Sequence, residues 1–331
     1  MNIVPLWTMI LGLGVFAYVV LDGFDLGIGM LYPLARSRDE RNLMMNSIAP
    51  IWDGNETWLV LGGTGLLAAF PLAFSIILPA VYFPILVMLL ALVFRGCAFE
   101  FRFRDAEHRG FWDHAFAYGS GVATFAQGMV LGALIQGFKV EGRAFTGGAF
   151  DCITPFTIFT GLALMCGYTL LGACWLVLKT EGALLKRARD YGRKALLATA
   201  AAVGIVSLWT PFIDPDIARR WFSWPNIAFL SPVPLATLAI ALLLWRALGR
   251  NTVRPFFYAV ALFTLSYLGI AISLYPMIVP HHFSLYDAAS SPETQTFLAL
   301  GTLFLLPIII VYTGWSYWVF RGKVRADTGY H

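Results

Sequence analysis

Charged residues are scarce in this sequence. Asp, Glu, Lys and Arg together supply 13% of its 331 residues, whereas an average soluble domain carries about 25%. Hydrophobic residues supply 59%, which is more apolar surface than a soluble fold can hide but which lipid accepts. The net charge is +4, yet the basic residues flank apolar runs and form no continuous basic face. This distribution excludes nucleic acid as a partner.

Histidine is absent from the middle of every apolar run. His108 and His114 precede the fourth run, His281 and His282 fall in an expected loop, and His331 ends the chain. Axial haem ligands in membranes usually come from helix interiors, so we expect this chain to bind no haem directly. No Gly-rich phosphate loop with Lys is present, which argues against ATP hydrolysis. The four cysteines form no CxxC pair, so we expect neither a metal site nor a disulfide framework.

Long apolar runs dominate what the sequence does contain. Each run of about 20 apolar residues predicts a membrane-spanning helix. Nine such windows occur, at 5–34, 48–70, 76–98, 113–138, 155–178, 195–211, 228–246, 255–277 and 295–320. The longest expected loops are 139–154, 179–194 and 278–294.

Lys and Arg are unevenly divided between the two ends of these windows. With nine spans, 19 of the 23 basic residues fall on one side. Cytoplasmic loops carry the excess of Lys and Arg in membrane proteins. We therefore expect a multi-pass membrane protein with the N-terminus outside and the C-terminus in the cytoplasm.

Four acidic residues lie inside the first two windows. Asp22 and Asp25 are three residues apart, and Asp53 and Glu56 share that spacing, so each pair lies on one helix face. The two windows are joined by a short loop at 35–47, which places all four carboxyl groups at similar depth near the cytoplasmic side. An ionisable residue within a span indicates function by default.

Proton transfer is the chemistry that a cluster of buried carboxyl groups can perform. Burial and like charge both disfavour ionisation, so clustered carboxyl groups can hold and pass protons near neutral pH. A hydrogen-bond network that only joins helices is the structural alternative. Arg95, at the end of the third window, is a candidate charge partner for these acids. Glu100 is a candidate entry point of the proton pathway. Gly23 and Gly27 form a GxxxG spacing that predicts close helix packing.

Three segments around these residues resemble a known family. Residues 22–29 read DGFDLGIG and resemble the DGFDLGxG motif of subunit II of cytochrome bd-type quinol oxidases. Residues 46–58 read NSIAPIWDGNETW and resemble that family's NSIAPxWDGNExW motif. Residues 94–102 contain the pairs Phe94-Arg95 and Phe99-Glu100, similar to its third-span motif. The modest length is similar to the cyanide-insensitive branch.

The resemblance implies a role within a larger enzyme of the bacterial inner membrane. A larger subunit I would carry two haems b and one haem d (or a further haem b), and a single-span small subunit often accompanies the pair. Quinol electrons would reduce O2 to water with cytoplasmic protons. The resemblance places Asp22 and Asp53 in the proton pathway, with Asp25 and Glu56 beside them. It places Trp58 near an oxygen route, and some relatives hold a structural quinone in subunit II.

The expected fold is therefore all-α and polytopic. We expect one integral membrane domain over 1–331, with a first four-helix bundle in 1–138 and a second bundle with a peripheral helix in 155–320. The expected function is proton delivery and scaffolding for a terminal quinol oxidase, with catalytic redox centres in the partner. A proton-coupled secondary transporter and a purely structural assembly subunit are the alternatives.

Overall fold

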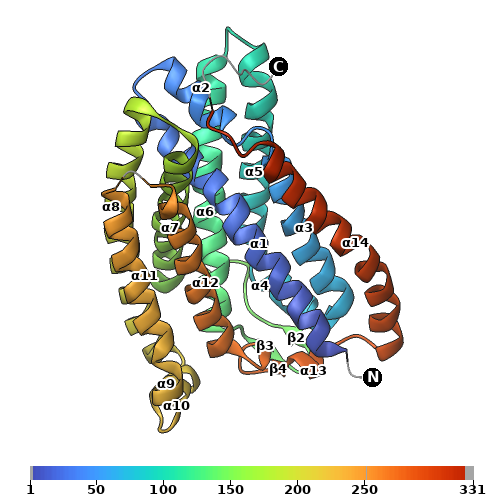
Figure 1. Ribbon diagram of the computed structural model, residues 1–331. Coiled ribbons are helices and arrows are strands. Elements are labelled where there is room, and N and C mark those ends of the chain that lie inside the picture. Colours follow the sequence, from blue (N-terminus) through green and yellow to red (C-terminus); the bar gives the residue numbers. More distant parts are fainter. Residues whose placement is uncertain (1–2, 251, 325–331) are drawn as a thin grey trace.

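A computed structural model describes residues 3–250 and 252–324. These residues are almost entirely helical, with two short β-hairpins at one end (Figure 1). The first half contains α1 (Val4–Leu31), η1 (Tyr32–Leu34), α2 (Arg38–Asn46), α3 (Trp52–Ala69), α4 (Pro71–Ala80), α5 (Tyr82–Arg104), α6 (Arg109–Gln136), β1 (Val140–Glu141) and β2 (Ala144–Phe145). The second half contains α7 (Pro155–Lys179), α8 (Gly182–Ile213), α9 (Pro215–Phe222), α10 (Asn226–Leu230), α11 (Pro232–Leu248), α12 (Arg254–Leu274), β3 (Met277–Val279), β4 (Phe283–Ser284), α13 (Leu285–Ala288) and α14 (Pro292–Val319).

The helices confirm a multi-span membrane protein. Within the described residues, eight are long and apolar enough to cross a membrane, namely α1 with η1, α5, α6, α7, α8, α10 with α11, α12 and α14. The expected span 48–70 corresponds to α3, which has 18 residues and begins with a polar turn, so it falls outside this group. The expected span 76–98 is divided between α4 and α5, and Pro79 inside α4 lacks the N–H that would continue the helix.

Two segments expected to be loops contain helix. Segment 35–47 contains α2, whose N-cap Ser37 accepts a hydrogen bond from the backbone N–H of Glu40. Segment 179–194 belongs mostly to α8, which begins at Gly182 and extends the expected span 195–211 by several turns. The hydropathy pattern did not indicate this extension, because the charged residues on one face of the helix give the segment the low hydropathy of a loop. Its apolar face recurs at helical spacing through buried residues Leu184, Ala188, Gly192 and Ala195.

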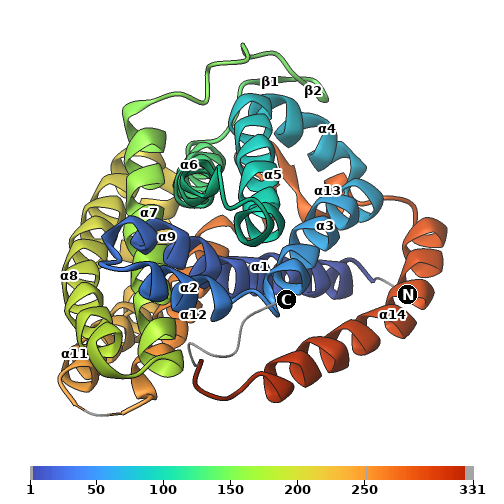
Figure 2. The ribbon, with the colours of Figure 1, turned by 90° about the horizontal axis from the view of Figure 1, so that it is seen from above.

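The long helices form two connected groups. In the second half, α7, α8, α11 and α12 contact one another in a closed ring. In the first half, α1 contacts α3 and α6, and α6 contacts α5. Helix α1 also packs along α7 and joins the two groups, as Figure 2 shows from above. Helix α14 lies to one side, against α3, and none of its apolar window is buried.

Glycines let α1 and α7 approach closely. A Cβ atom added at Gly27 would overlap the carbonyl oxygen of Tyr168, and one added at Gly172 would lie 2.5 Å from the carbonyl carbon of Gly27. A Cβ at Gly23 would meet the Tyr168 ring at 2.8 Å. The close packing predicted from the GxxxG spacing is therefore confirmed, and it seals the part of α1 that carries the acidic residues.

The end of α14 is fixed to α7 at the end of the molecule where α2 lies, which we call the α2 end (Figure 1). The Lys179 ammonium donates to the carbonyl oxygen of Phe320. In return, the Lys323 ammonium donates to the carbonyl oxygens of Val177 at 3.3 Å and Thr180 at 3.0 Å. These bonds satisfy carbonyls left open where α7 ends. The other end of α14 is held by Trp7 of α1, whose indole N–H donates to the carbonyl oxygen of Gln295 at 3.1 Å.

Candidate functional site: a buried carboxylate cluster

The acidic half of α1 is enclosed on every side. All residues from Asp22 to Gly29 are buried, because α3, α6 and α7 pack around this stretch. Phe24 stacks on Trp175 of α7 with ring centroids 4.1 Å apart. A charge placed here has no water around it in this chain and needs a partner inside the protein.

Arg95 of α5 is that partner. Its Nη1 lies 2.8 Å from Asp22 Oδ1 and 2.6 Å from Glu56 Oε1, and its Nη2 lies 3.8 Å from Asp25 Oδ2. The side chains of Arg95, Asp22 and Asp25 are wholly buried, whereas that of Glu56 is 25% exposed. One guanidinium from the third expected span thus gathers three carboxyl groups from the first two.

Asn55 is a member that the sequence reasoning missed. Its Nδ2 donates to Asp25 Oδ2 at 2.8 Å and to the carbonyl oxygen of Leu21 at 3.3 Å. Its Oδ1 accepts from the Tyr317 hydroxyl of α14 at 2.9 Å. A buried amide inside a span is unusual in the same way as an acid, so its place between Asp53 and Glu56 was a usable signal.

The other predicted residues lie at the rim or outside the cluster. Asp53 is exposed on the first turn of α3, close enough to Glu56 for electrostatic interaction. Glu100 is 54% exposed and pairs with Arg104 at 3.4 Å. Trp58 is buried, and its indole N–H has no acceptor in the described part of the chain. The structure therefore joins Asp22, Asp25 and Glu56 directly, and leaves Asp53 and Glu100 at the surface of this chain.

A second polar group lies one turn from Asp22, away from the α2 end. Gln127 of α6 donates from Nε2 to the Tyr18 hydroxyl at 2.6 Å. The Tyr168 hydroxyl of α7 donates to Gln127 Oε1 at 3.0 Å. Sequence reasoning considered only acids and histidines within spans and missed this group, although Gln127 is an amide in the middle of the window 113–138.

A separate charged cluster closes the α2 end. Asp113 of α6 accepts from Arg102 Nε at 2.5 Å, from the Tyr32 hydroxyl at 2.7 Å and from Arg41 at 3.2 Å. Arg102 also donates to Asn42 at 2.8 Å. These bonds tie α2, η1, α5 and α6 together beyond the end of the carboxylate cluster. Every ionised member has a partner of opposite charge, which indicates a structural role.

The histidines do not fit a haem within the helical core. His108 is 66% exposed and interacts with Asp105, and His114 is exposed and bonds to the carbonyl oxygen of Gly110. His281 and His282 lie in the β3–β4 hairpin. His331 lies outside the described residues. No described histidine therefore points between the helices where an axial ligand would be needed.

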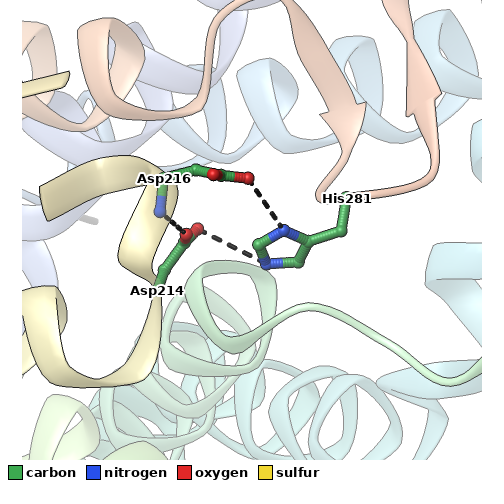
Figure 3. Close-up of side chains that lie close together, drawn as sticks. All are labelled: Asp214, Asp216 and His281. Carbon is green, nitrogen blue, oxygen red and sulfur yellow. Dashed lines mark hydrogen bonds and ion pairs between the residues drawn. The ribbon is translucent and has the colours of Figure 1, made fainter. Parts of the chain in front are cut away.

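Asp214, Asp216 and His281 form a further group at the hairpin end (Figure 3). His281 Nε2 lies 3.4 Å from Asp214 Oδ2, and its Nδ1 lies 3.8 Å from Asp216 Oδ2. Asp214 also caps α9 by accepting from the backbone N–H of Asp216 at 2.8 Å. Arg219 forms an ion pair with Asp216. These contacts connect the α8–α9 corner to the hairpin.

Comparison with known proteins identifies the family of this chain. The family model described as cytochrome bd terminal oxidase subunit II matches residues 3–320. The chain is 28% identical to cytochrome bd-I ubiquinol oxidase subunit 2 of Escherichia coli (strain K12), with 97% of this chain and 95% of that protein covered. It is 29% identical to cytochrome bd ubiquinol oxidase subunit 2 of Bacillus subtilis (strain 168), covering 96% of both.

A solved structure shares the fold. A chain from the bd oxidase of Geobacillus thermodenitrificans superposes with a TM-score of 0.76 at 17% identity, covering 96% of this chain and 99% of that one. The resemblance inferred from the acidic motifs is thereby confirmed over almost the whole sequence. This chain belongs to the cytochrome bd terminal oxidase subunit II family.

Proposed function

We propose that this chain, as subunit II of a quinol-oxidising terminal oxidase, takes up protons for O2 reduction through its buried carboxylate cluster. The observation that carries the proposal is the sharing of one guanidinium by three carboxyl groups. If all three were ionised, two negative charges would have no cation within the cluster. One proton held by the three groups halves that excess and two protons remove it, and such coupled groups exchange protons as a unit.

The proposed pathway runs from the exposed acidic side chains to the buried ones. Asp53 is exposed at the start of α3, Glu56 is 25% exposed, and Asp25 and Asp22 are wholly buried. A proton taken up at Asp53 would pass to Glu56 and then to the pair on α1. Glu100 is an outlying surface acid in this scheme, and Arg95 is the fixed positive charge that holds the carboxyl groups together. Trp58 is proposed to border an oxygen route.

The proposed topology has nine crossings. Counting α3 with the eight apolar helices places the N-terminus outside and α2 with the C-terminus in the cytoplasm, which agrees with the excess of Lys and Arg there. In this arrangement α1, α3 with α4, α5 and α6 form the first four-helix bundle. Helices α7, α8, α11 and α12 form the second, and α14 is peripheral. A fluorescent protein fused to the C-terminus should mature on the cytoplasmic side.

The redox centres are proposed to lie in a larger, haem-bearing subunit I, since the described histidines do not fit a haem here. A single-span small subunit, lipid and a structural quinone are further proposed partners. Haems b and d in subunit I would supply electron transfer and O2 reduction. The residues of this chain would hold and move protons and scaffold the complex.

The test is steady-state oxygen consumption by the assembled oxidase. Asp22→Asn and Asp53→Asn keep side-chain size but remove the exchangeable proton. Both should slow quinol-driven oxygen consumption while the reduced-minus-oxidised haem spectrum stays unchanged. Asp190→Asn, at an exposed position of α8, is the matched control. Wild-type turnover in both variants, with full assembly, would refute proton delivery and favour a structural subunit. Loss of haem would show that the residue supports assembly instead.

A further inference from the structure

The hydrogen bonds of Gln127 determine whether each of the two neighbouring tyrosine hydroxyls acts as a donor or as an acceptor. Its amide N–H is directed to Tyr18 and its amide oxygen to Tyr168. The hydroxyl proton of Tyr168 is therefore committed to Gln127. The hydroxyl of Tyr18 acts as an acceptor towards Gln127, so its own proton is available for another group.

That other group is Asp22. Tyr18 precedes Asp22 by four residues, so the two side chains share one face of α1, and they lie close enough to interact. Both carboxylate oxygens of Asp22 are buried, and apart from the Arg95 ion pair at Oδ1 neither has a hydrogen-bond donor of normal geometry in the described residues. An oxygen without a donor thus faces a hydroxyl whose proton is uncommitted. Both residues are almost inaccessible to water, with Tyr18 5% and Asp22 0% exposed.

We infer that Tyr18 is the positioning residue for the proton on Asp22, and that Gln127 holds its hydroxyl in place. This inference rests on the proposed function. A hydroxyl offers one donor and two acceptor sites, and Gln127 occupies one acceptor site. The Tyr18 hydroxyl donates a hydrogen bond to Asp22 when the carboxyl group is ionised. It accepts from the carboxyl O–H when Asp22 is protonated.

This arrangement makes proton exchange at Asp22 easier. Rotation of one hydroxyl keeps a hydrogen bond between Tyr18 and Asp22 in both protonation states of Asp22, with no movement of heavy atoms. Tyr18 itself neither gains nor loses a proton over the cycle, so the proton on Asp22 comes from Glu56 or Asp25 and leaves towards the partner subunit. The other charged or titratable groups that act on this position are Arg95 of α5, Glu56 of α3, Asp25 of α1, Tyr168 of α7 and Tyr317 of α14.

The experiment compares two buried tyrosines that bond to the same amide. Tyr18→Phe and Tyr168→Phe each remove one hydroxyl, and each is measured in the assembled oxidase for oxygen consumption as a function of pH. We expect Tyr18→Phe to lower turnover by about tenfold, the effect of losing one hydrogen bond to a charged group. Its pH profile should move to higher pH, because ionised Asp22 loses its donor. Tyr168→Phe should keep turnover within about twofold and leave the profile unchanged.

Gln127→Leu keeps the Tyr18 hydroxyl but removes the amide N–H that donates to it. It should shift the pH profile in the same direction as Tyr18→Phe, and it supplies the same test if Tyr18→Phe fails to assemble. Equal effects of Tyr18→Phe and Tyr168→Phe, or an unchanged pH profile in Tyr18→Phe and Gln127→Leu, would overturn the inference. Asp22→Asn measured in parallel separates the two proposals. If Asp22→Asn is slow while Tyr18→Phe is normal, only the positioning role fails, whereas normal turnover in both Asp22→Asn and Asp53→Asn removes the proposed function itself.

Discussion

Arg95 and Asp22 form an ion pair of 2.8 Å in which both side chains are fully enclosed by protein. The same guanidinium nitrogen lies 2.6 Å from Glu56. An isolated charge in such a place would be very unfavourable, because the protein interior replaces none of the water that it loses. The cation and the carboxyl groups therefore depend on one another.

Removing the cation should be among the most damaging single changes in this chain. Arg95→Leu leaves carboxyl groups buried without a positive partner, which costs about 3–5 kcal/mol when a buried pair is broken. We expect a large loss of folded protein, measured by fluorescence-detected gel filtration after stepwise heating. Arg104→Leu is the control, because Arg104 is 79% exposed and pairs only with exposed Glu100. Equal stability of the two variants would contradict the structural account of the cluster.

The close contact between α1 and α7 predicts a second sensitive position. Gly27→Ala places a methyl group against the Tyr168 carbonyl, a backbone atom that cannot swing away. The two helices would have to separate, and overpacking of this kind typically costs about 1–3 kcal/mol. Gly63→Ala on α3 is the control, since a Cβ there would meet nothing within 4 Å. Thermal unfolding of the purified complex should show a lower midpoint for Gly27→Ala alone.

Asn55 links the peripheral helix α14 to the carboxylate cluster, and two variants separate its bonds. Tyr317→Phe removes only the bond from α14 to Asn55, so stability should fall by about 0.5–1.5 kcal/mol with turnover nearly unchanged. Asn55→Leu also removes the donor to Asp25 and should slow oxygen consumption as well. Slow turnover in Tyr317→Phe, with intact haem spectra, would mean that α14 takes part in the proton pathway directly.

A pH-dependent contact lies at the α2 end, where Glu40 of α2 pairs with Arg187 of α8. Partial burial alone would raise the pKa of Glu40, but the backbone N–H of Arg36 and the Arg187 guanidinium outweigh it and hold this pKa below its usual range. The contribution to stability is therefore complete above the ordinary pKa of glutamate and is lost as the pH falls through the lower folded value.

Glu40→Gln removes this contribution. The melting temperature of the variant should lie below that of the wild type near neutral pH, and the difference should shrink as the pH is lowered into the acidic range. Glu107→Gln, at an exposed position, provides the comparison and should follow the wild type at every pH. A difference between Glu40→Gln and wild type that grows on acidification would contradict the ion pair.

Much of the fold and part of the cluster followed from sequence pattern. Asp22, Asp25 and Glu56 were found because an acid within an apolar run is conspicuous, and helical spacing predicted that Asp22 and Asp25 share one face of α1, whereas Asp53, expected in the same cluster, lies at the surface. The tight packing at Gly27 followed from GxxxG spacing. Such residues can be predicted from the sequence, because helical periodicity and the cost of burying a charge depend on the local order of residues.

Other features depend on contacts between distant segments. The sequence offered Arg95 as one candidate partner but could not show that it reaches three carboxyl groups, since that depends on how α5 packs beside α1 and α3. Neutral polar residues such as Asn55 and Gln127 were overlooked because only titratable groups were considered. The extension of α8 was missed because charged residues on an aqueous face resemble a loop in hydropathy.

The most direct test of proton delivery is the rate of proton uptake during one turnover. The assembled oxidase carrying Asp22→Asn would be placed in vesicles with a pH-sensitive dye on its cytoplasmic side, reduced, and exposed to a pulse of O2. We predict that uptake slows at least tenfold relative to Asp190→Asn, a change of about 1.4 kcal/mol or more in the barrier, while the first haem oxidation step keeps its rate. Uptake as fast as in Asp190→Asn would contradict the account.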